Sequence, residues 1–374
     1  MKINILKEKL KEGIGIVEKI SQKSLTLPVL QNTLLKTEKN FLKLSTTNLE
    51  SAINWWGLVK IEKQGEICIP TRFLSNFLNL LPNKPISLNI ENFIMDLVCD
   101  NYKTKIKGIN PEEFPIIPQL KEGQTIKIDN LSFCQALSQI INIPSVSTAR
   151  PEISGIYFIF ESNLIKMVAT DSFRLAEKKI FIDTKISKRH SLILPQSAAK
   201  EIISVFSEKQ GDLKICFSPN QILFEYMMSG VNHPQIQFIS RLIGGEYPNY
   251  EEIIPKKYKT EVQVQKKELL NQIKGASLFS GKVNEVKLKI SPKSNKIEVL
   301  SQSPDLGEYK SFFIGDVKGD DLVVSFNHRF LIDGITEIRK DKLSFELTDE
   351  DGPAALKPLG DEDYLYIIMP IKST

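Results

Sequence analysis

The chain has 374 residues, of which 41% are apolar and 25% charged, and its formal net charge is only +4. This balance is typical of a globular protein with substantial cores and excludes a disordered chain. So small a net charge also excludes a uniformly basic nucleic-acid binder. Any role on DNA therefore requires basic groups gathered on one face.

Signals for export, membranes and metals are missing from the sequence. The N-terminal string MKINILKEKLKEGIGIVEKI is amphipathic and interrupted by charges, unlike a signal peptide. No segment approaches the ~18 apolar residues that span a bilayer. The four cysteines form no CxxC pair and the three histidines have no metal-ligand spacing. We expect a cytoplasmic protein with reduced, buried thiols, no metal, no cofactor and no membrane partner.

The first third of the chain predicts a short strand followed by a helix. Its apolar face is formed by Leu6, Leu10, Ile14, Val17 and Ile20. An extended pair with a polar turn at residues 38–40 follows, as a hairpin requires. A further strand runs to Pro70, where proline fits the start of a second helix. The apolar face of that helix is formed by Phe73, Leu74, Phe77, Leu78 and Leu81.

The same order of elements recurs twice. In the second third, the first helix is marked by Phe133, Leu137, Ile140 and Ile141, and the second helix, after Pro195, by Ile202, Ile203 and Phe206. In the last third, the first helix is marked by Leu269, Leu270, Ile273 and Leu278. The second helix there follows Asn327, which can serve as an N-cap. Polar hairpin turns are expected at residues 161–163 and 292–295.

The chain therefore reads as three α+β units of roughly 120 residues, an ordinary domain size. We place the domains at residues 1–122, 123–255 and 256–374, with linkers near 119–123 and 255–260. Each unit is expected to have two helices on one side and antiparallel strands on the other.

Five strings carry a family resemblance across the whole chain, in order. They are LPVLQNTLLKT with LSTTNLE, IKGINPEEFP, VATDSFRLAE, SRLIGGEYPNYEEIIP and YIIMPIK. Together they resemble the bacterial DNA polymerase III beta subunit, the sliding-clamp family. The resemblance implies three similar clamp domains per chain in a head-to-tail dimeric ring, with helices lining the hole and antiparallel sheets outside. Two identical heterologous contacts close such a ring by rotation.

The resemblance implies a non-enzymatic function for the chain. It would encircle double-stranded DNA without sequence preference and tether the replicative polymerase as a processivity factor. Its partners would be the polymerase III alpha subunit and an ATP-dependent clamp loader, which bind through linear peptides. Repair polymerases and a ligase are further candidates.

Phosphate contacts from Lys and Arg suit a surface that must hold DNA and still slide. The positions expected to bind DNA are Lys23, Arg72, Arg150 and Lys200. Any single one of these residues can instead be a solvated surface charge. Two family contacts are not kept, because Ser24 stands at an arginine position and Gln196 or Ser197 at a basic one.

The resemblance also implies an apolar pocket for the linear peptides. The matching positions are Ile153, Thr170, Ser172, Phe173, Arg174, Leu175, Pro248, Ile253, Val283, Asn327, Phe330, Ile367, Ile368, Met369, Pro370, Ile371 and Lys372. Ser172 and Phe173 replace a family Gly-His pair, and Glu252 reverses a rim charge. Taken alone, the run 367–371 is better explained as a core strand, and only its match to the family tail favours the pocket.

The dimer contact is expected to join the end of the first unit to the third unit of another copy. The candidates are Lys103, Lys105 and Ile106 on one side, and Leu278, Phe279, Asp305 and Glu308 on the other. The family carries more acids in this part of the third unit, so we predict an interface that depends less on charge.

Two other functional classes remain as alternatives. Asp171 and Ser172 with a distant His190 could be imagined as nucleophilic machinery. However, the chain has no G-x-S-x-G elbow, no Walker A loop and no GxGxxG after a strand, and Asp171 fits the anchor of a turn better. An open nucleic-acid-binding module is the third class, and it lacks a known motif here.

Overall fold

The computed structural model describes residues 1–21, 27–120, 122–144, 149–183 and 186–372. They fold into two compact units, one formed by Met1–Cys134 with Ser197–Leu242 and the other by Gln135–Gln196 with Ile243–Thr374. The units divide the middle third of the chain between them. Every strand pairing among the described residues is antiparallel, as predicted.

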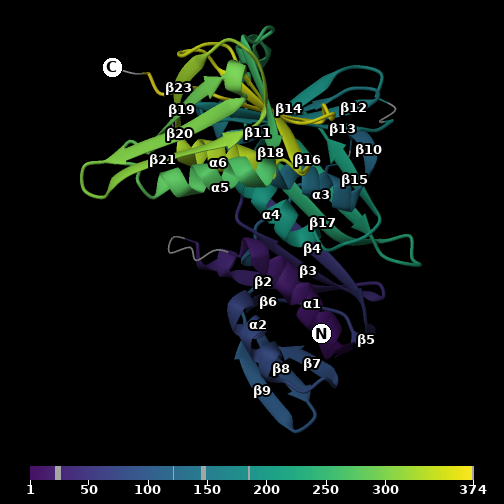
Figure 1. Ribbon diagram of the computed structural model, residues 1–374. Coiled ribbons are helices and arrows are strands. Elements are labelled where there is room, and N and C mark those ends of the chain that lie inside the picture. Colours follow the sequence, from purple (N-terminus) through teal and green to yellow (C-terminus); the bar gives the residue numbers. More distant parts are fainter. Residues whose placement is uncertain (22–26, 121, 145–148, 184–185, 373–374) are drawn as a thin grey trace. The chain divides into compact units, whose positions relative to one another are not determined.

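The first unit contains a five-stranded and an eight-stranded sheet (Figure 1). The five-stranded sheet has the order β5 (Lys60–Lys63), β1 (Lys2–Leu6), β7 (Pro85–Glu91), β8 (Ile94–Cys99) and β9 (Tyr102–Lys107). The eight-stranded sheet has the order β10 (Gln124–Asp129), β15 (Asp212–Phe217), β16 (Gln221–Met227), β17 (Pro234–Arg241), β4 (Ser51–Leu58), β3 (Phe41–Thr47), β2 (Asn32–Glu38) and β6 (Glu66–Pro70).

The second unit contains a nine-stranded and a four-stranded sheet. The nine-stranded sheet has the order β14 (His190–Pro195), β11 (Gly155–Phe160), β12 (Leu164–Thr170), β13 (Arg174–Phe181), β26 (Tyr364–Ile368), β25 (Ala354–Pro358), β24 (Lys342–Leu347), β18 (Thr260–Gln265) and β22 (Asp316–Gly319). The four-stranded sheet has the order β21 (Gly307–Ile314), β20 (Lys296–Ser303), β19 (Glu285–Ser291) and β23 (Leu322–Asn327).

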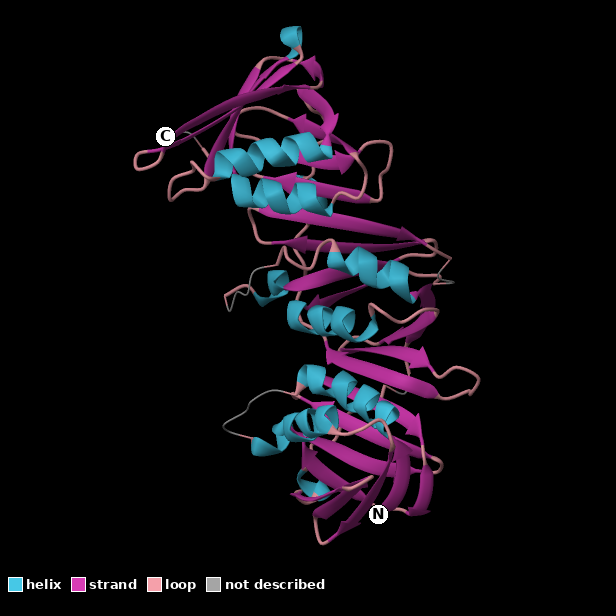
Figure 2. Ribbon diagram, turned by 60° about the horizontal axis from the view of Figure 1, so that its bottom comes forward, coloured by secondary structure: helices cyan, strands magenta, loops and turns pink. Residues whose placement is uncertain are grey.

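Six α-helices pack on these sheets within the described residues (Figure 2). They are α1 (Lys7–Val17), α2 (Thr71–Leu80), α3 (Asn130–Ser138), α4 (Gln196–Phe206), α5 (Lys266–Ser277) and α6 (His328–Glu337). Helix α1 lies beside α2 and covers β3 and β4, and α5 lies beside α6. No described helix is long and apolar enough to cross a membrane.

The predicted helix starts agree with the structure. Helix α2 begins directly after Pro70, and the Asn327 Oδ1 accepts a hydrogen bond from the Arg329 N–H at 3.0 Å, which caps α6. The predicted apolar faces are correct for most positions, including Leu10, Ile14 and Val17. They are wrong at their margins. Leu6, Phe73 and Leu278 are exposed, because Leu6 precedes α1, Leu278 follows α5, and Phe73 is on the outer side of α2.

Strands from consecutive thirds of the chain pair with one another in the same sheet. The predicted extended pair after each first helix is a set of three strands, and the third strand of one repeat pairs with the last strand of the next. β4 pairs with β17 and β13 pairs with β26. We call these two pairings the first junction and the second junction. A repeat therefore does not close its own sheet, which explains why the compact units cut across the repeats.

The cysteines are free thiols. Cys68, Cys99 and Cys134 are buried, as predicted, whereas Cys216 is only partly buried. Burial raises the pKa of both Cys68 and Cys134 to about 12, so these two thiols stay protonated at neutral pH.

Candidate functional site

A tight turn joins β12 to β13 and projects one aromatic side chain from the second junction. The Asp171 Oδ1 accepts the backbone N–H groups of Phe173 and Arg174, each at 3.0 Å. The Thr170 hydroxyl donates to the Arg174 carbonyl at 2.8 Å and accepts the Ser172 N–H at 3.2 Å. Asp171 thus anchors the turn as predicted. The turn leaves the Phe173 side chain 62% exposed.

Arg174 connects this turn to α6. Its side chain is 9% exposed, and its Nε lies 2.9 Å from an Asp171 carboxylate oxygen. Its Nη1 pairs with Asp333 on α6, and its guanidinium lies 4.4 Å from the ring centroid of Phe330. Phe330 also stacks on Phe173, with centroids 6.4 Å apart and planes inclined by 27°. One cation and two aromatic rings therefore hold the exposed face of the turn against the helix.

The C-terminal tail runs along the same features. The Met369 N–H donates to the Phe173 carbonyl at 2.9 Å, and the Ile371 N–H donates to the Ser325 carbonyl at 2.8 Å. The tail after β26 therefore lies between the turn and β23. Met369, Pro370 and Ile371 are half-buried and Lys372 is exposed.

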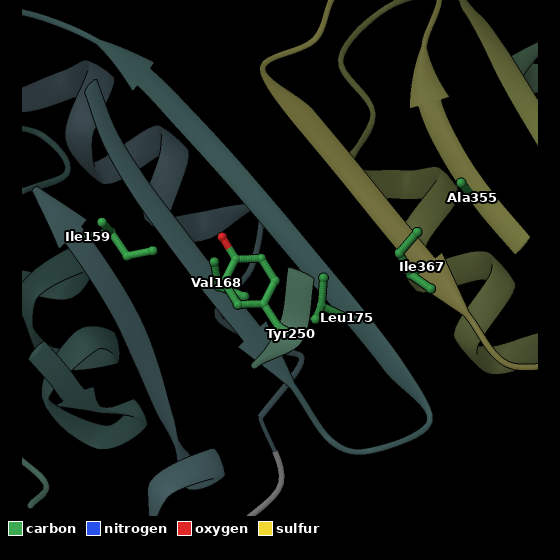
Figure 3. Packing of buried hydrophobic residues seen from close by; sticks show 6 residues of the cluster. All are labelled: Ile159, Val168, Leu175, Tyr250, Ala355 and Ile367. Atoms are coloured by element: carbon green, nitrogen blue, oxygen red, sulfur yellow. The ribbon is translucent and has the colours of Figure 1, made fainter. Parts of the chain in front are cut away.

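An apolar cluster fills the other face of the sheet at the second junction (Figure 3). Leu175 pairs in register with Ile367, and both are buried. In Figure 3 the Tyr250 ring lies across the strands that carry Val168 and Leu175. The Tyr250 hydroxyl donates to a Glu177 carboxylate oxygen at 2.7 Å, and burial is the main cause that raises the pKa of Tyr250. This buried cluster therefore supports the strands that carry the turn and the tail.

The predicted pocket residues divide into three groups. Ile153, Thr170, Leu175, Ile367 and Ile368 are buried in the scaffold. Phe173, Ile253 and Val283 are exposed, Ile253 by 44%. Pro248, Asn327 and Phe330 are half-buried.

The structure brings the turn, α6 and the tail together through the contacts given above. Val283 lies in the loop before β19, where the His328 N–H donates to the Asn284 carbonyl at 2.8 Å, so this loop borders the start of α6.

Sequence reasoning missed three groups that organise this site. Asp333 binds Arg174, the Tyr366 hydroxyl donates to the Phe330 carbonyl at 2.8 Å, and the Tyr247 ring stacks on Tyr157 with centroids 4.6 Å apart. The spacing of Phe330 and Asp333, one helical turn apart, was the available signal for a shared face.

The residues expected to bind DNA lie in different settings. Arg72 is exposed in the first turn of α2 and Lys200 is exposed on α4. Arg150 lies beside the turn at the second junction, with its Nη1 3.5 Å from the Ser172 Oγ and its Nε 3.3 Å from a Glu152 carboxylate oxygen. Lys23 lies outside the described residues.

The residues expected at a dimer contact lie on or beside two sheet edges. Lys103, Lys105 and Ile106 belong to β9, the last strand of the five-stranded sheet, and the Ile106 side chain is buried in its own unit. Leu278 is exposed after α5, and Phe279 stacks on Tyr309 of β21 with centroids 5.9 Å apart.

Asp305, just before β21, and Glu308, within it, are exposed, and β21 is the last strand of the four-stranded sheet. Among the described residues, no cluster of three or more His, Cys, Asp or Glu could hold a metal ion.

Comparison with known proteins identifies the architecture. The structure superposes on the DNA polymerase sliding clamp of Bacillus subtilis with a TM-score of 0.94 and 25% identity, over 100% of both chains. It superposes on the DNA polymerase III subunit beta of Pseudomonas aeruginosa with a TM-score of 0.94 and 22% identity, also over 100% of both chains, a likeness of fold. The Beta sliding clamp of Staphylococcus aureus is 27% identical over 358 residues, 93% of each chain.

The repeated sets of strands, joined between repeats, and the paired helices thus define a three-domain sliding-clamp fold, as predicted. Models of the N-terminal, central and C-terminal domains of the DNA polymerase III beta subunit match residues 1–118, 127–249 and 251–372. The chain therefore belongs to the DNA polymerase III beta subunit family, whose members serve in DNA replication.

Proposed function

We propose that two copies of this chain close head to tail into a ring around double-stranded DNA. The observation that carries the proposal is a pair of open sheet edges. β4 and β13 are each the third strand after a first helix, and each pairs with the last strand of the following repeat. Their counterpart in the last repeat is β21 and the last strand of the first repeat is β9, and both end their own sheets.

Joining β21 to β9 of a second copy repeats the pairing already present at both junctions. Such a contact is heterologous, and two of them close a ring of six repeats. An open edge also presents unpaired N–H and C=O groups, which favour strand addition. The domain limits at residues 1–122, 123–255 and 256–374 are part of this proposal.

Inside such a ring, exposed cations on the helices would contact phosphates without reading sequence. Arg72 and Lys200 are the described candidates on helices, and Arg150 is a candidate for either DNA or peptide contact. A chain with this role tethers the replicative polymerase in the cytoplasm, is opened by an ATP-dependent loader, and performs no catalysis itself.

Solution mass tests ring formation directly. Sedimentation equilibrium should give twice the chain mass of 42.4 kDa for the wild type. Leu278→Asp should shift the species toward the monomer, because it places a charge on an exposed apolar residue beside the β21 edge. Phe181→Asp is the matched control, since Phe181 is 68% exposed on β13, which is paired within its own sheet. A wild type that stays monomeric at micromolar concentration would refute the proposal.

We further propose that the second junction binds the linear peptide of the polymerase III alpha subunit. Phe173, Ile253 and Val283 are exposed apolar side chains on the surface of the second unit, above a well-packed core, and exposed apolar surface suits a short extended ligand. The loader and repair enzymes would use the same surface. Glu252 accepts a hydrogen bond from the Asn249 amide at 2.6 Å, so its carboxylate is held on the rim.

Substitution of Phe173 tests this placement. Phe173→Asp should weaken binding of the cognate alpha-subunit peptide at least tenfold in fluorescence anisotropy, while the solution mass is unchanged. Phe181→Asp is the matched control, because Phe181 is 68% exposed at the other end of β13. Equal affinities for Phe173→Asp and the wild type would show that the peptide binds elsewhere.

A further inference from the structure

The turn at the second junction has a counterpart at the first junction with the same hydrogen bonds. The Asn48 Oδ1 accepts the N–H groups of Glu50 and Ser51 at 3.0 and 2.6 Å. The Thr47 hydroxyl donates to the Ser51 carbonyl at 2.9 Å and accepts the Leu49 N–H at 3.0 Å. These are the four bonds that Asp171 and Thr170 make in the other turn. The φ angles of +75° at Leu49 and +78° at Ser172 are also alike.

The strands around the two turns correspond as well. Ala52 pairs with Ile239 as Leu175 pairs with Ile367. The Arg241 N–H donates to the Glu50 carbonyl at 2.9 Å, as the Met369 N–H does to Phe173. The framework that supports the proposed peptide site is therefore present twice in the chain.

The connecting segments repeat the correspondence in sequence. Residues 111–118 read PEEFPIIP and residues 248–255 read PNYEEIIP. Pro111 and Ile116 thus stand where Pro248 and Ile253 stand at the second junction. A short 3-10 turn lies in each segment, at Pro111–Glu113 before the first Ile-Ile-Pro and at Tyr250–Ile253, where it includes the first isoleucine of the second. Ile116 is 94% exposed, more than Ile253, so it offers a free apolar contact.

An open groove of about 760 Å³ lies along this segment at the first junction. That volume is in the range of ligand sites. Ile116, Ile239 and Trp56 are among its apolar lining residues. At the second junction two tyrosine rings fill the corresponding part of the surface, where Tyr247 stacks on Tyr157. By strand register Leu34 takes the position of Tyr157, which leaves the first junction more open.

The charges lining the groove favour a basic ligand. Its two lysines are already neutralised, since Lys36 lies 2.8 Å from Glu66 and Lys43 lies 3.5 Å from Glu38. Glu112 also lines the groove and has no ion pair among the described residues. The lining therefore carries one uncompensated negative charge beside the apolar side chain of Ile116.

We propose that this groove is a second peptide-binding site, for an extended segment of a partner protein that carries apolar side chains next to a Lys or Arg. The apolar side chains contact Ile116 and the half-buried Leu34, and the cation faces Glu112. The inference rests on the proposed function only in treating the second junction as a peptide site. A partner with two such segments would gain avidity by engaging both junctions.

A labelled eight-residue peptide that alternates leucine and lysine is the probe. It should bind the full-length chain saturably in fluorescence anisotropy, and at least tenfold more tightly than a peptide that alternates leucine and glutamate. Ile116→Ser should weaken binding at least fivefold and Glu112→Gln at least twofold. Leu80→Ser is the matched control for loss of an exposed apolar side chain in the same unit.

Three results would overturn the proposal. They are no saturable binding, equal binding of the two peptides, and binding that Ile253→Ser weakens while Ile116→Ser does not. The cognate alpha-subunit peptide, measured on the same variants, tests the second junction separately. If Ile253→Ser leaves its affinity unchanged while Ile116→Ser weakens the leucine–lysine probe, the peptide site proposed at the second junction fails and the first-junction site stands.

Discussion

Arg174 should stabilise the second junction through a charge pair that is nearly closed to water. The Arg174 and Asp171 side chains are 9% and 10% exposed, and their charged atoms are 2.9 Å apart. Removing one partner of a buried pair typically costs ~3–5 kcal/mol, because the remaining charge stays unpaired in a poorly solvated place. Losing the cation–π contact with Phe330 adds about 1 kcal/mol. We therefore expect Arg174→Met to lower the local opening free energy by about 4–6 kcal/mol.

Hydrogen exchange measured by mass spectrometry over residues 164–181 reports this quantity locally. Asp171→Asn is the partner variant, since its amide oxygen can still accept the two backbone N–H groups of the turn. The double variant should cost about 2 kcal/mol less than the sum of the single variants, because no charge is then left unpaired. Additive costs, or a loss below about 1 kcal/mol for Arg174→Met, would refute the assigned role.

Three further outcomes are expected. Burial raises the pKa of Glu201 to about 7, although a hydrogen bond from Ser51 lowers it, so the folded state binds more protons than the unfolded state between about pH 4.5 and 7. The urea midpoint of the first unit should therefore fall as pH rises through this window, and Glu201→Gln should remove this pH dependence. Gly334→Ala places a Cβ 2.5 Å from the Tyr366 ring and should lower the free energy of unfolding by ~1–3 kcal/mol, whereas the Cβ of Gly15→Ala meets no atom within 4 Å and should stabilise α1 by up to about 1 kcal/mol. Equal shifts of the melting temperature for the two variants would contradict this packing. The dimer dissociation constant should change little between low and high salt in sedimentation, and a steep dependence would contradict the predicted interface.

Local features of the fold could be predicted because they depend on neighbouring residues. The start of α2 after Pro70, the Asn327 cap and the Asp171 turn follow from the conformational preferences of single residues. Helical spacing also identified the buried faces. It failed at Leu6 and Leu278, because spacing alone does not show where a helix begins or ends.

The sharing of sheets between repeats could not be read from the sequence. Trp55 pairs with Ile236, far along the chain, and the local sequence of neither strand predicts which strand it pairs with. The contacts of Arg174 with Asp333 and Phe330 depend on the same long-range assembly, so the site was predicted as a set of positions without its charge network. The repeated turn at Thr47–Ser51 was missed for a different reason. Its strings TTNLES and ATDSFR share few residues, although the hydrogen bonds between their side chains and the backbone are the same.

Retention on circular DNA tests the central claim most directly. The chain is loaded by its cognate clamp loader onto a nicked circular plasmid, and the circle is then linearised or left intact. A ring that encloses DNA stays on the intact circle through a high-salt wash and slides off the linear form. Equal release from the two substrates would contradict the proposed clamp, because ordinary phosphate binding does not depend on whether the DNA has ends.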